Sequence, residues 1–235
     1  MDRVVIIAGG GSGTRMGGEV PKQFIDLAGR PVVMHSMDAF HRWDSRVEVI
    51  LVLPEDFIGY WEELCAKYSF GMTHKVVKGG RTRFHSIRNA LLPVGGDPLV
   101  GVHDAVRPLV STETIKRCFD TAEKWGSAVP CLEIPDSVRS VEGDRSRPVN
   151  RSSLRTIQTP QVFRYSILVT AYARDYDPEI TDDASVVERA GQVLRLVQGN
   201  RENFKITTRP DLLMAEKLLG QRGEPAMPGN GHSSG

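Results

Sequence analysis

The chain has 235 residues, a length that suits one large domain and can bury a substantial core without disulfides or metals. Its formal net charge of +1 and ordinary share of charged residues, 25%, exclude the basic excess typical of proteins that bind nucleic acids or acidic membrane surfaces. We therefore expect neither a nucleic acid nor a membrane as a partner.

The first half of the chain alternates short β-branched runs with amphipathic segments. Buried strands are predicted at residues 4–8, 47–53, 75–78 and 99–103. Helices are predicted at residues 31–40, 55–68, 83–92 and 114–124. This alternation indicates an α/β fold with a mainly parallel mixed sheet in a three-layer arrangement, and such sheets bind ligands beyond the carboxyl ends of their strands.

The alternation stops at about residue 136. Residues 136–159 show a hairpin pattern around Glu142-Gly143-Asp144 but carry five arginines, so we predict a projecting β-arm. After it, helices are predicted at 165–174, 183–190 and 210–219, and strands at 192–197 and 204–207. The organisation expected is a single domain over residues 1–220, followed by a disordered Gly/Pro/Ser-rich tail at 221–235.

Two features bear on the cellular compartment. The apolar run at residues 4–8 is shorter than the apolar region of a signal peptide, and no apolar stretch is long enough to span a bilayer. The three cysteines, Cys65, Cys118 and Cys131, have no metal-binding spacing and are expected to be free thiols in a reducing cytosol. We therefore expect a cytoplasmic protein.

The first predicted strand runs into a glycine-rich loop, "VVIIAGGGSGTRMGGEVPKQF". Glycine allows a phosphate to approach the backbone amides closely. The dinucleotide pattern GxGxxG and the Walker pattern GxxxxGK[ST] are both absent. Arg15 and Lys22 lie seven residues apart around the loop, and amides with two cations suit a triphosphate better than a pyrophosphate diester. A glycine turn with solvated cations is the alternative, but this combination directly after a buried strand favours phosphate binding.

Five motifs in order carry a more specific resemblance. They are "AGGGSGTRMGGEVPKQF", "GGRTRFHS" (79–86), "VHDAVRP" (102–108), "TPQ" (159–161) with "TDDAS" (181–185), and "NFKITTRPDL" (203–212). From Val4 to about Leu219 the chain resembles the 2-C-methyl-D-erythritol 4-phosphate cytidylyltransferase family, among the nucleotidyltransferases with a Rossmann-like, glycosyltransferase-A-like fold. Ile7-Ala8 departs mildly from the pair of small residues usual in that family. The resemblance implies transfer of CMP from CTP to 2-C-methyl-D-erythritol 4-phosphate, with release of pyrophosphate, in non-mevalonate isoprenoid precursor synthesis.

The resemblance also implies a set of site residues. The catalytic cations would be Arg15, Lys22 and Lys205. The nucleotide would be bound by Ala8, Gly9, Gly10, Gly11, Gly13, Thr14, Gly80, Arg83 and Ser86. The acceptor would be bound by Asp104, Arg107, Ser137, Arg151, Thr159 and Lys205. Cations are needed because the acceptor phosphate, itself an anion, must approach a second anion, and positioning with electrostatic stabilisation performs most of phosphoryl-transfer catalysis.

Individual residues in these motifs keep other interpretations. Asp104, at the carboxyl end of a predicted strand, could hold Mg²⁺ or accept hydrogen bonds from acceptor hydroxyls; the resemblance favours the hydroxyls, with Mg²⁺ or another divalent cation held mainly by the CTP phosphates. Lys205 could be an exposed edge lysine, although it alternates with apolar neighbours and would point away from them. Thr181 and Asp182 are equally a helix N-cap, and His103 is expected to be a packed, structural histidine.

The resemblance further implies a homodimer in which the arms embrace and each delivers Arg151 to the partner's acceptor site. Three other functions remain open from the sequence. A D-ribitol 5-phosphate cytidylyltransferase shares the nucleotide-binding half. A dinucleotide-dependent oxidoreductase would explain the glycine loop but leave Lys22 and Lys205 without a role. A non-catalytic nucleotide sensor would not need all three cations.

Overall fold

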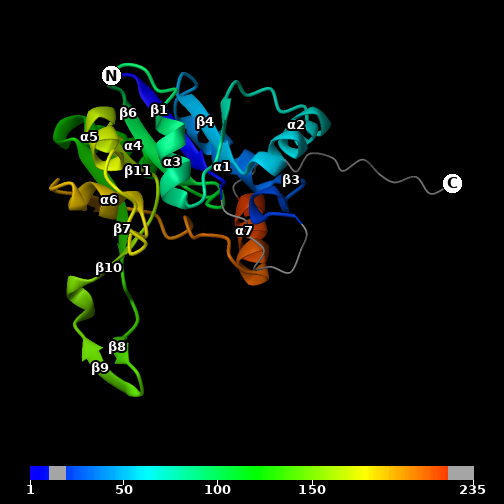
Figure 1. Ribbon diagram of the computed structural model, residues 1–235. Helices are drawn as coiled ribbons and strands as arrows, with labels where there is room; N and C mark the ends of the chain where they lie inside the picture. The colour runs from blue at the N-terminus through cyan, green and yellow to red at the C-terminus, as the bar shows by residue number, and fades with distance from the viewer. Residues whose placement is uncertain (11–19, 222–235) are drawn as a thin grey trace.

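The computed structural model describes residues 1–10 and 20–221 (Figure 1). Its centre is an eight-stranded sheet in the order β10-β7-β11-β6-β1-β4-β5, with β12 also paired to β7. The strands are β1 (Arg3–Ala8), β4 (Glu48–Leu53), β5 (Lys75–Lys78), β6 (Leu99–Asp104), β7 (Ser127–Glu133), β10 (Arg155–Ile157), β11 (Gln161–Arg164) and β12 (Leu196–Gln198). Strands β6, β1, β4 and β5 are parallel, and β11 pairs antiparallel with β6 and β7. The predicted mainly parallel mixed sheet is confirmed.

Helices cover both faces of this sheet (Figure 1). They are α1 (Val32–Trp43), α2 (Ile58–Lys67), α3 (Arg83–Leu91), α4 (Thr112–Trp125), α5 (Tyr165–Tyr172), α6 (Asp183–Arg189) and α7 (Arg209–Gln221). Because side chains alternate along a strand, Val5 and Ile7 of β1 join the core beneath α1, α2 and α4. Val4 and Ile6 join the opposite core with α3, α5 and α6. This alternation produces the three-layer architecture.

A third, smaller core joins the C-terminal part of the chain to the body. The short strands β2 (Asp26–Leu27) and β3 (Arg30–Pro31) form a hairpin next to the 3₁₀ turn η2 (Lys22–Phe24). Leu27 of the hairpin packs with Ile206 and with Ala215 and Leu219 of α7. This core therefore holds the segment before α7 against the part of the chain that follows the glycine-rich loop.

The strands predicted in the first half of the chain are confirmed to within one residue. The helix predicted at 55–68 begins as a 3₁₀ turn, η3 (Glu55–Phe57), before α2. The strand predicted at 204–207 is wrong: this segment is irregular, the Ile206 amide bonds to the Val106 carbonyl in a loop, and side chains bond to the backbone of Thr207. Strand β7 was not predicted; it begins directly after Gly126, which ends α4, and it contains Pro130, a residue uncommon in central strands.

The arm is a two-stranded hairpin of β8 (Val138–Glu142) and β9 (Arg145–Val149), and it projects from the body (Figure 1). The 3₁₀ turn η4 (Arg151–Ser153) follows. The predicted boundary at 159 is wrong, because β10 returns to the main sheet and pairs with β7, and Thr159 is buried. Arg155 and Thr156 are polar, like the residues of the arm, and were therefore assigned to it, although they lie on an outer strand of the sheet.

No helix within residues 1–10 and 20–221 has the length and apolar content needed to cross a membrane. The predicted tail lies outside the described residues, except Gln221, which ends α7.

Candidate active site

The two ends of the glycine-rich loop meet at the carboxyl end of β1. The amide of Gly9 donates to the carbonyl of Val52 in β4 at 3.0 Å, and Gln23 Nε2 donates to the Gly9 carbonyl at 2.8 Å. A Cβ atom on Gly9 would lie 2.9 Å from the Val52 oxygen, so this position has no room for a side chain. The base of the loop is therefore closed beside Ala8 and Gly10. The predicted residues Gly11, Gly13, Thr14 and Arg15 lie outside the described residues.

A second glycine turn, after β5, lies against the first. The Gly80 amide donates to Ser86 Oγ at 3.0 Å, and Ser86 Oγ donates to the Thr82 carbonyl at 3.0 Å. A Cβ atom on Gly10 would lie 2.9 Å from Ser86 Oγ, so the two glycine turns are in contact. The structure thus brings together Gly10, Gly80 and Ser86, which were predicted to bind the nucleotide.

Arg83, at the start of α3, forms an ion pair with the buried carboxylate of Asp183. Its two terminal nitrogens donate to the two oxygens of Asp183 at 2.9 and 2.5 Å, and the Tyr172 hydroxyl donates to Asp183 at 2.5 Å. Burial alone would lower the pKa of Arg83, but the charge of Asp183 and its hydrogen bonds raise it. About a third of the Arg83 side chain stays exposed, 33%.

Asp104 ends β6 directly opposite Ala8 of β1. Its Oδ2 accepts from Arg107 Nε at 3.0 Å and lies 3.2 Å from Lys205 Nζ. Burial would raise the pKa of this carboxyl, but the charges of Lys205, Arg83 and Arg107 outweigh it and hold the pKa well below its usual range. Asp104 is therefore ionised and surrounded by cations.

Residues 203–207, hereafter the 203–207 segment, contact or contain the other cations of the site. Arg107 donates to the Asn203 carbonyl at 2.7 Å, and Lys22 Nζ donates to the Thr207 carbonyl at 2.7 Å. Lys205 lies between these two contacts and extends to Asp104, while Ile206 is buried in the third core. The expected alternation of Lys205 with apolar neighbours is confirmed, although the segment is no strand.

Thr159 lies directly behind Asp104. Its Oγ1 accepts from the Asp104 amide at 3.1 Å and is 3.0 Å from His103 Nδ1. His103 Nε2 donates to the Arg107 carbonyl at 3.0 Å, and the ring packs edge-on against Phe40. Burial lowers the pKa of His103 to about 4, so the ring is neutral near pH 7. His103 is packed, as expected, and it also ties Thr159 to the turn that carries Arg107.

Two predicted acceptor residues do not join this group within one chain. Ser137 and Arg151 are exposed on the arm, which projects away from the body (Figure 1). Arg151 donates to the Pro135 carbonyl. Asp182 is the N-cap of α6 and accepts from the Ser185 amide at 2.9 Å, which is the capping role left open by the sequence.

The residues at the site support anion binding rather than a protein-built metal centre. Four cations, Arg83, Arg107, Lys205 and Lys22, gather here with two carboxylates, Asp104 and Asp183, and Lys22 is bound to the segment that carries Lys205. Within residues 1–10 and 20–221, no group of three or more His, Cys, Asp or Glu side chains is placed to hold a metal ion. The surplus of positive charge at the carboxyl ends of parallel strands suits a ligand with several phosphates.

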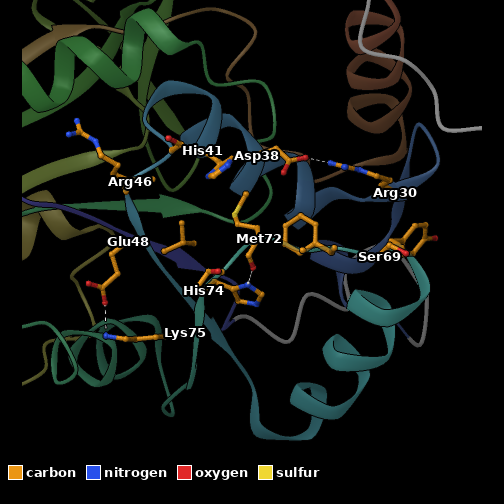
Figure 2. Close-up of a pocket in the computed structure, with 16 residues that line it drawn as sticks. Arg30, Asp38, His41, Arg46, Glu48, Ser69, Met72, His74 and Lys75 are labelled. Carbon is orange, nitrogen blue, oxygen red and sulfur yellow. Dashed lines mark hydrogen bonds and ion pairs between the residues drawn. The ribbon is translucent and has the colours of Figure 1, made fainter.

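A separate hollow lies at the opposite end of the sheet (Figure 2). It has a volume of ≈ 720 Å³ and is lined by residues just before and at the start of β4 and β5. Its lining includes two ion pairs, Lys75 with Glu48 at 2.7 Å and Arg30 with Asp38, and a third lining cation, Arg46, pairs with Asp44. None of the predicted site residues lines it, so it is not the candidate active site.

Sequence reasoning missed several residues that shape the site. Gln23 closes the base of the loop, Asp183 clamps Arg83, and the fully buried Asn203 donates to the Thr159 carbonyl at 2.7 Å. The quoted motifs contain Gln23, Asn203 and Asp183. Membership in a motif was the only signal in the sequence that these residues have a role at the site. Their partners are distant in sequence, so the motifs could not assign them a role.

The fold and the site define the class. An α/β protein with a glycine-rich loop after its first strand, and cations gathered at the carboxyl ends of parallel strands, is a nucleotidyltransferase-type protein. A family model described as 2-C-methyl-D-erythritol 4-phosphate cytidylyltransferase matches residues 3–221. The chain belongs to this family.

Individual relatives agree along nearly the whole chain. A 2-C-methyl-D-erythritol 4-phosphate cytidylyltransferase of Porphyromonas gingivalis is 48% identical over 219 residues, which cover 92% of this chain and 97% of the relative. One of Phocaeicola vulgatus is 47% identical over 219 residues, covering 93% and 100%. The crystal structure of the Thermus thermophilus 2-C-methyl-D-erythritol 4-phosphate cytidylyltransferase aligns with a TM-score of 0.76 at 34% identity, over 93% of this chain and 98% of that one.

Proposed function

We propose that this chain transfers CMP from CTP to 2-C-methyl-D-erythritol 4-phosphate, giving 4-diphosphocytidyl-2-C-methyl-D-erythritol and pyrophosphate. It thereby acts in non-mevalonate isoprenoid precursor synthesis. Family membership supports the reaction, and the observation that carries it in the structure is the convergence of Arg107, Lys205 and Arg83 on Asp104 beside the two glycine turns.

The chemistry needs positioning and positive charge. An oxygen of the acceptor phosphate attacks the α-phosphorus of CTP in line, and the bond from that phosphorus to the pyrophosphate oxygen breaks. The attacking oxygen is already anionic, so no general base is required. We assign Lys22, Lys205 and Arg15 to the charge that develops on the α-phosphate and the leaving pyrophosphate. The 203–207 segment already joins the two lysines: Lys22 donates to its Thr207 carbonyl, and its Lys205 extends to Asp104.

The nucleotide lies, in this proposal, against the two glycine turns. Ala8, Gly9 and Gly10, with the loop residues Gly11, Gly13 and Thr14, supply backbone groups to the phosphates. Gly80 and Ser86 read the cytosine, with Arg83 beside them. The contact between the two turns supports a single continuous nucleotide site.

The acceptor lies on the Asp104 side. The ionised carboxylate of Asp104 accepts hydrogen bonds from acceptor hydroxyls, and Thr159 orients the backbone behind it. Arg107 and Lys205 hold the acceptor phosphate. Arg107 is well suited to this because its guanidinium is already fixed by Asp104 and the Asn203 carbonyl.

A divalent cation, Mg²⁺ or a substitute, enters this proposal with the nucleotide. Asp104 is the carboxylate at the site, and its Oδ2 already contacts Arg107 and Lys205, which makes it a weak partner for a further cation. The CTP phosphates would hold the ion, and Asp104 could contact it only through water. Bound there, the ion neutralises charge on the triphosphate.

The proposal includes a homodimer through the arm. A two-stranded hairpin such as β8–β9 is only marginally stable in water unless another surface covers it. A second arm would supply that surface and carry Ser137 and Arg151 to the partner's acceptor site. We also place the enzyme in the cytoplasm, because all three of its cysteines are free.

A pyrophosphate-release assay tests the function. Wild-type protein with CTP, Mg²⁺ and 2-C-methyl-D-erythritol 4-phosphate should release pyrophosphate, and excess chelator or replacement of CTP by ATP should abolish most of it. D-ribitol 5-phosphate is the matched acceptor control, and faster turnover of it would reassign the acceptor. Absence of pyrophosphate release with either acceptor would refute the proposed function.

A further inference from the structure

One oxygen of Asp211 collects three hydrogen bonds at the start of α7. Oδ2 accepts from the Thr207 amide at 2.9 Å, the Thr207 hydroxyl at 2.9 Å and the Thr208 amide at 2.8 Å. The Asp211 amide donates in turn to Thr208 Oγ1 at 3.4 Å. The exchange with Thr208 is a capping box for α7. A helix cap does not need the two bonds from Thr207 to Asp211. These two bonds fix the position of Thr207.

Thr207 carries the carbonyl to which Lys22 donates. The Lys22 side chain is nearly buried, at 8% exposure, and its Nζ lies 2.7 Å from that oxygen. Lys22 comes from the turn after the glycine-rich loop, 185 residues away in sequence. Asp211 therefore fixes the atom that holds Lys22, although it touches neither Lys22 nor the glycine turns.

The same segment carries Lys205. Its first residue, Asn203, is anchored by hydrogen bonds to Thr159 and from Gln158. At its centre, the Ile206 amide donates to the Val106 carbonyl at 2.9 Å, and the Ile206 side chain is buried. Its other end is anchored by Asp211. Because no sheet ladder holds this stretch, these separate anchors determine where Lys205 lies.

We propose that Asp211 is a positioning residue for the reaction: it holds the 203–207 segment so that Lys22 and Lys205 stand at fixed places beside the phosphates. This inference rests on the proposed function for its kinetic consequence. Misplacing a catalytic group by about 1 Å can lower a rate roughly 100-fold, and a lysine ammonium on a flexible stem has no geometry of its own to preserve.

The test compares Asp211→Ala with Asp97→Ala. Asp97 is a matched control, because its carboxylate accepts from the amide and hydroxyl of Ser166 at the start of α5 but lies at the amino end of β6, away from the site. Both variants should lower the melting temperature to a similar extent. Only Asp211→Ala should lower kcat, by roughly 10- to 100-fold.

A double-mutant cycle separates positioning from general damage. If Asp211 acts through Lys22, then in a Lys22→Arg background Asp211→Ala should lower kcat much less than it does in wild-type protein. Equal losses in both backgrounds would overturn the inference. Asp211→Asn, which keeps an acceptor oxygen, should fall between wild type and Asp211→Ala, and it replaces Asp211→Ala in every measurement if the alanine variant does not fold.

A measurement on the ligand-free protein does not depend on activity. Reductive methylation followed by peptide mass spectrometry reports the accessibility of Lys22. We expect Lys22 to react several-fold faster in Asp211→Ala than in wild-type protein or Asp97→Ala. Equal labelling in all three proteins would overturn the inference. Faster labelling in a protein that releases no pyrophosphate would support the positioning by Asp211 and refute the proposed function instead.

Discussion

The two ends of the central sheet use charge in opposite ways. At the amino ends of β4 and β5, each Arg or Lys that lines the hollow has a carboxylate partner, as Lys75 has Glu48 at 2.7 Å (Figure 2). At the carboxyl ends, Arg107 and Lys205 share one carboxylate, Asp104, and Arg83 is close enough to lower its pKa further. The first end matches its lining cations with carboxylates, and the second gathers several cations around one carboxylate.

This difference shows that a hollow alone does not mark the site. The hollow is lined by ion pairs such as the exposed Lys75–Glu48 pair, and exposed pairs contribute little to stability. The site lies where parallel strands end, because loops leave every strand there in the same direction and bring distant residues together. A surplus of cations at that edge favours an anionic ligand.

The largest expected effect comes from exchanging one lysine at each end. Lys205 and Lys75 are comparably exposed, at 47% and 54%, and each lies beside one carboxylate. Lys205→Ala should lose roughly 2.7–4 kcal/mol of transition-state stabilisation, as should Lys22→Ala and Arg15→Ala, by analogy with loss of an oxyanion donor. Lys75→Ala should leave kcat unchanged. Steady-state kinetics beside thermal melts give both values, and a near-normal kcat for Lys205→Ala would contradict its role.

The pH dependence of the free energy of unfolding tests the burial of His103 at the carboxyl end of the sheet. Burial lowers the pKa of His103 to about 4, so between pH 6.5 and 4 the unfolded chain binds a proton that the folded chain does not. Stability should therefore fall as the pH drops through this window and level off below it, by about 3 kcal/mol from this group. His103→Asn should flatten the profile of free energy of unfolding against pH. A profile that His103→Asn leaves unchanged would count against the assignment.

Subunit mixing tests whether the carboxyl end is completed by a second chain. Lys22→Ala and Arg151→Ala should each be nearly inactive alone. If Arg151 serves the partner's site, each mixed dimer has one site with both defects and one intact site. Random mixing should then restore up to about a quarter of wild-type activity per subunit. If mixing restores no activity, or if light scattering shows a monomer, the arm does not contribute to the partner's site.

The smallest expected effect is at the amino end. The coupling energy of the exposed Lys75–Glu48 pair, from a double-mutant cycle with Lys75→Ala and Glu48→Gln, should be about 0.2–1 kcal/mol. It should shrink in high salt because exposed charges are screened. Urea unfolding of the four proteins at low and high salt measures it. A coupling that is larger and independent of salt would show that this end is more than a solvated surface.

The motifs predicted where some of the candidate site residues lie in relation to the strands. Ala8, Gly9 and Asp104 were expected at strand ends, and they lie there because glycine turns and apolar runs are local features. The clamp of Asp183 on Arg83 was not predictable, since the two residues are 100 positions apart. Nothing in "TDDAS" distinguishes a carboxylate that caps a helix from one that binds an arginine, and this motif contains both.

The sequence by itself determined the α/β alternation, the two glycine turns and the existence of the arm, because each depends on neighbouring residues and on the periods of strands and helices. Only the tertiary structure decided that residues 203–207 are held by side chains and a loop carbonyl instead of a strand, and that β10 belongs to the sheet rather than to the arm. It also decided that Lys22 is bound to Thr207, 185 residues away. These outcomes depend on which backbone groups find a partner once the layers have packed, and that competition is settled by contacts between segments that no local pattern encodes.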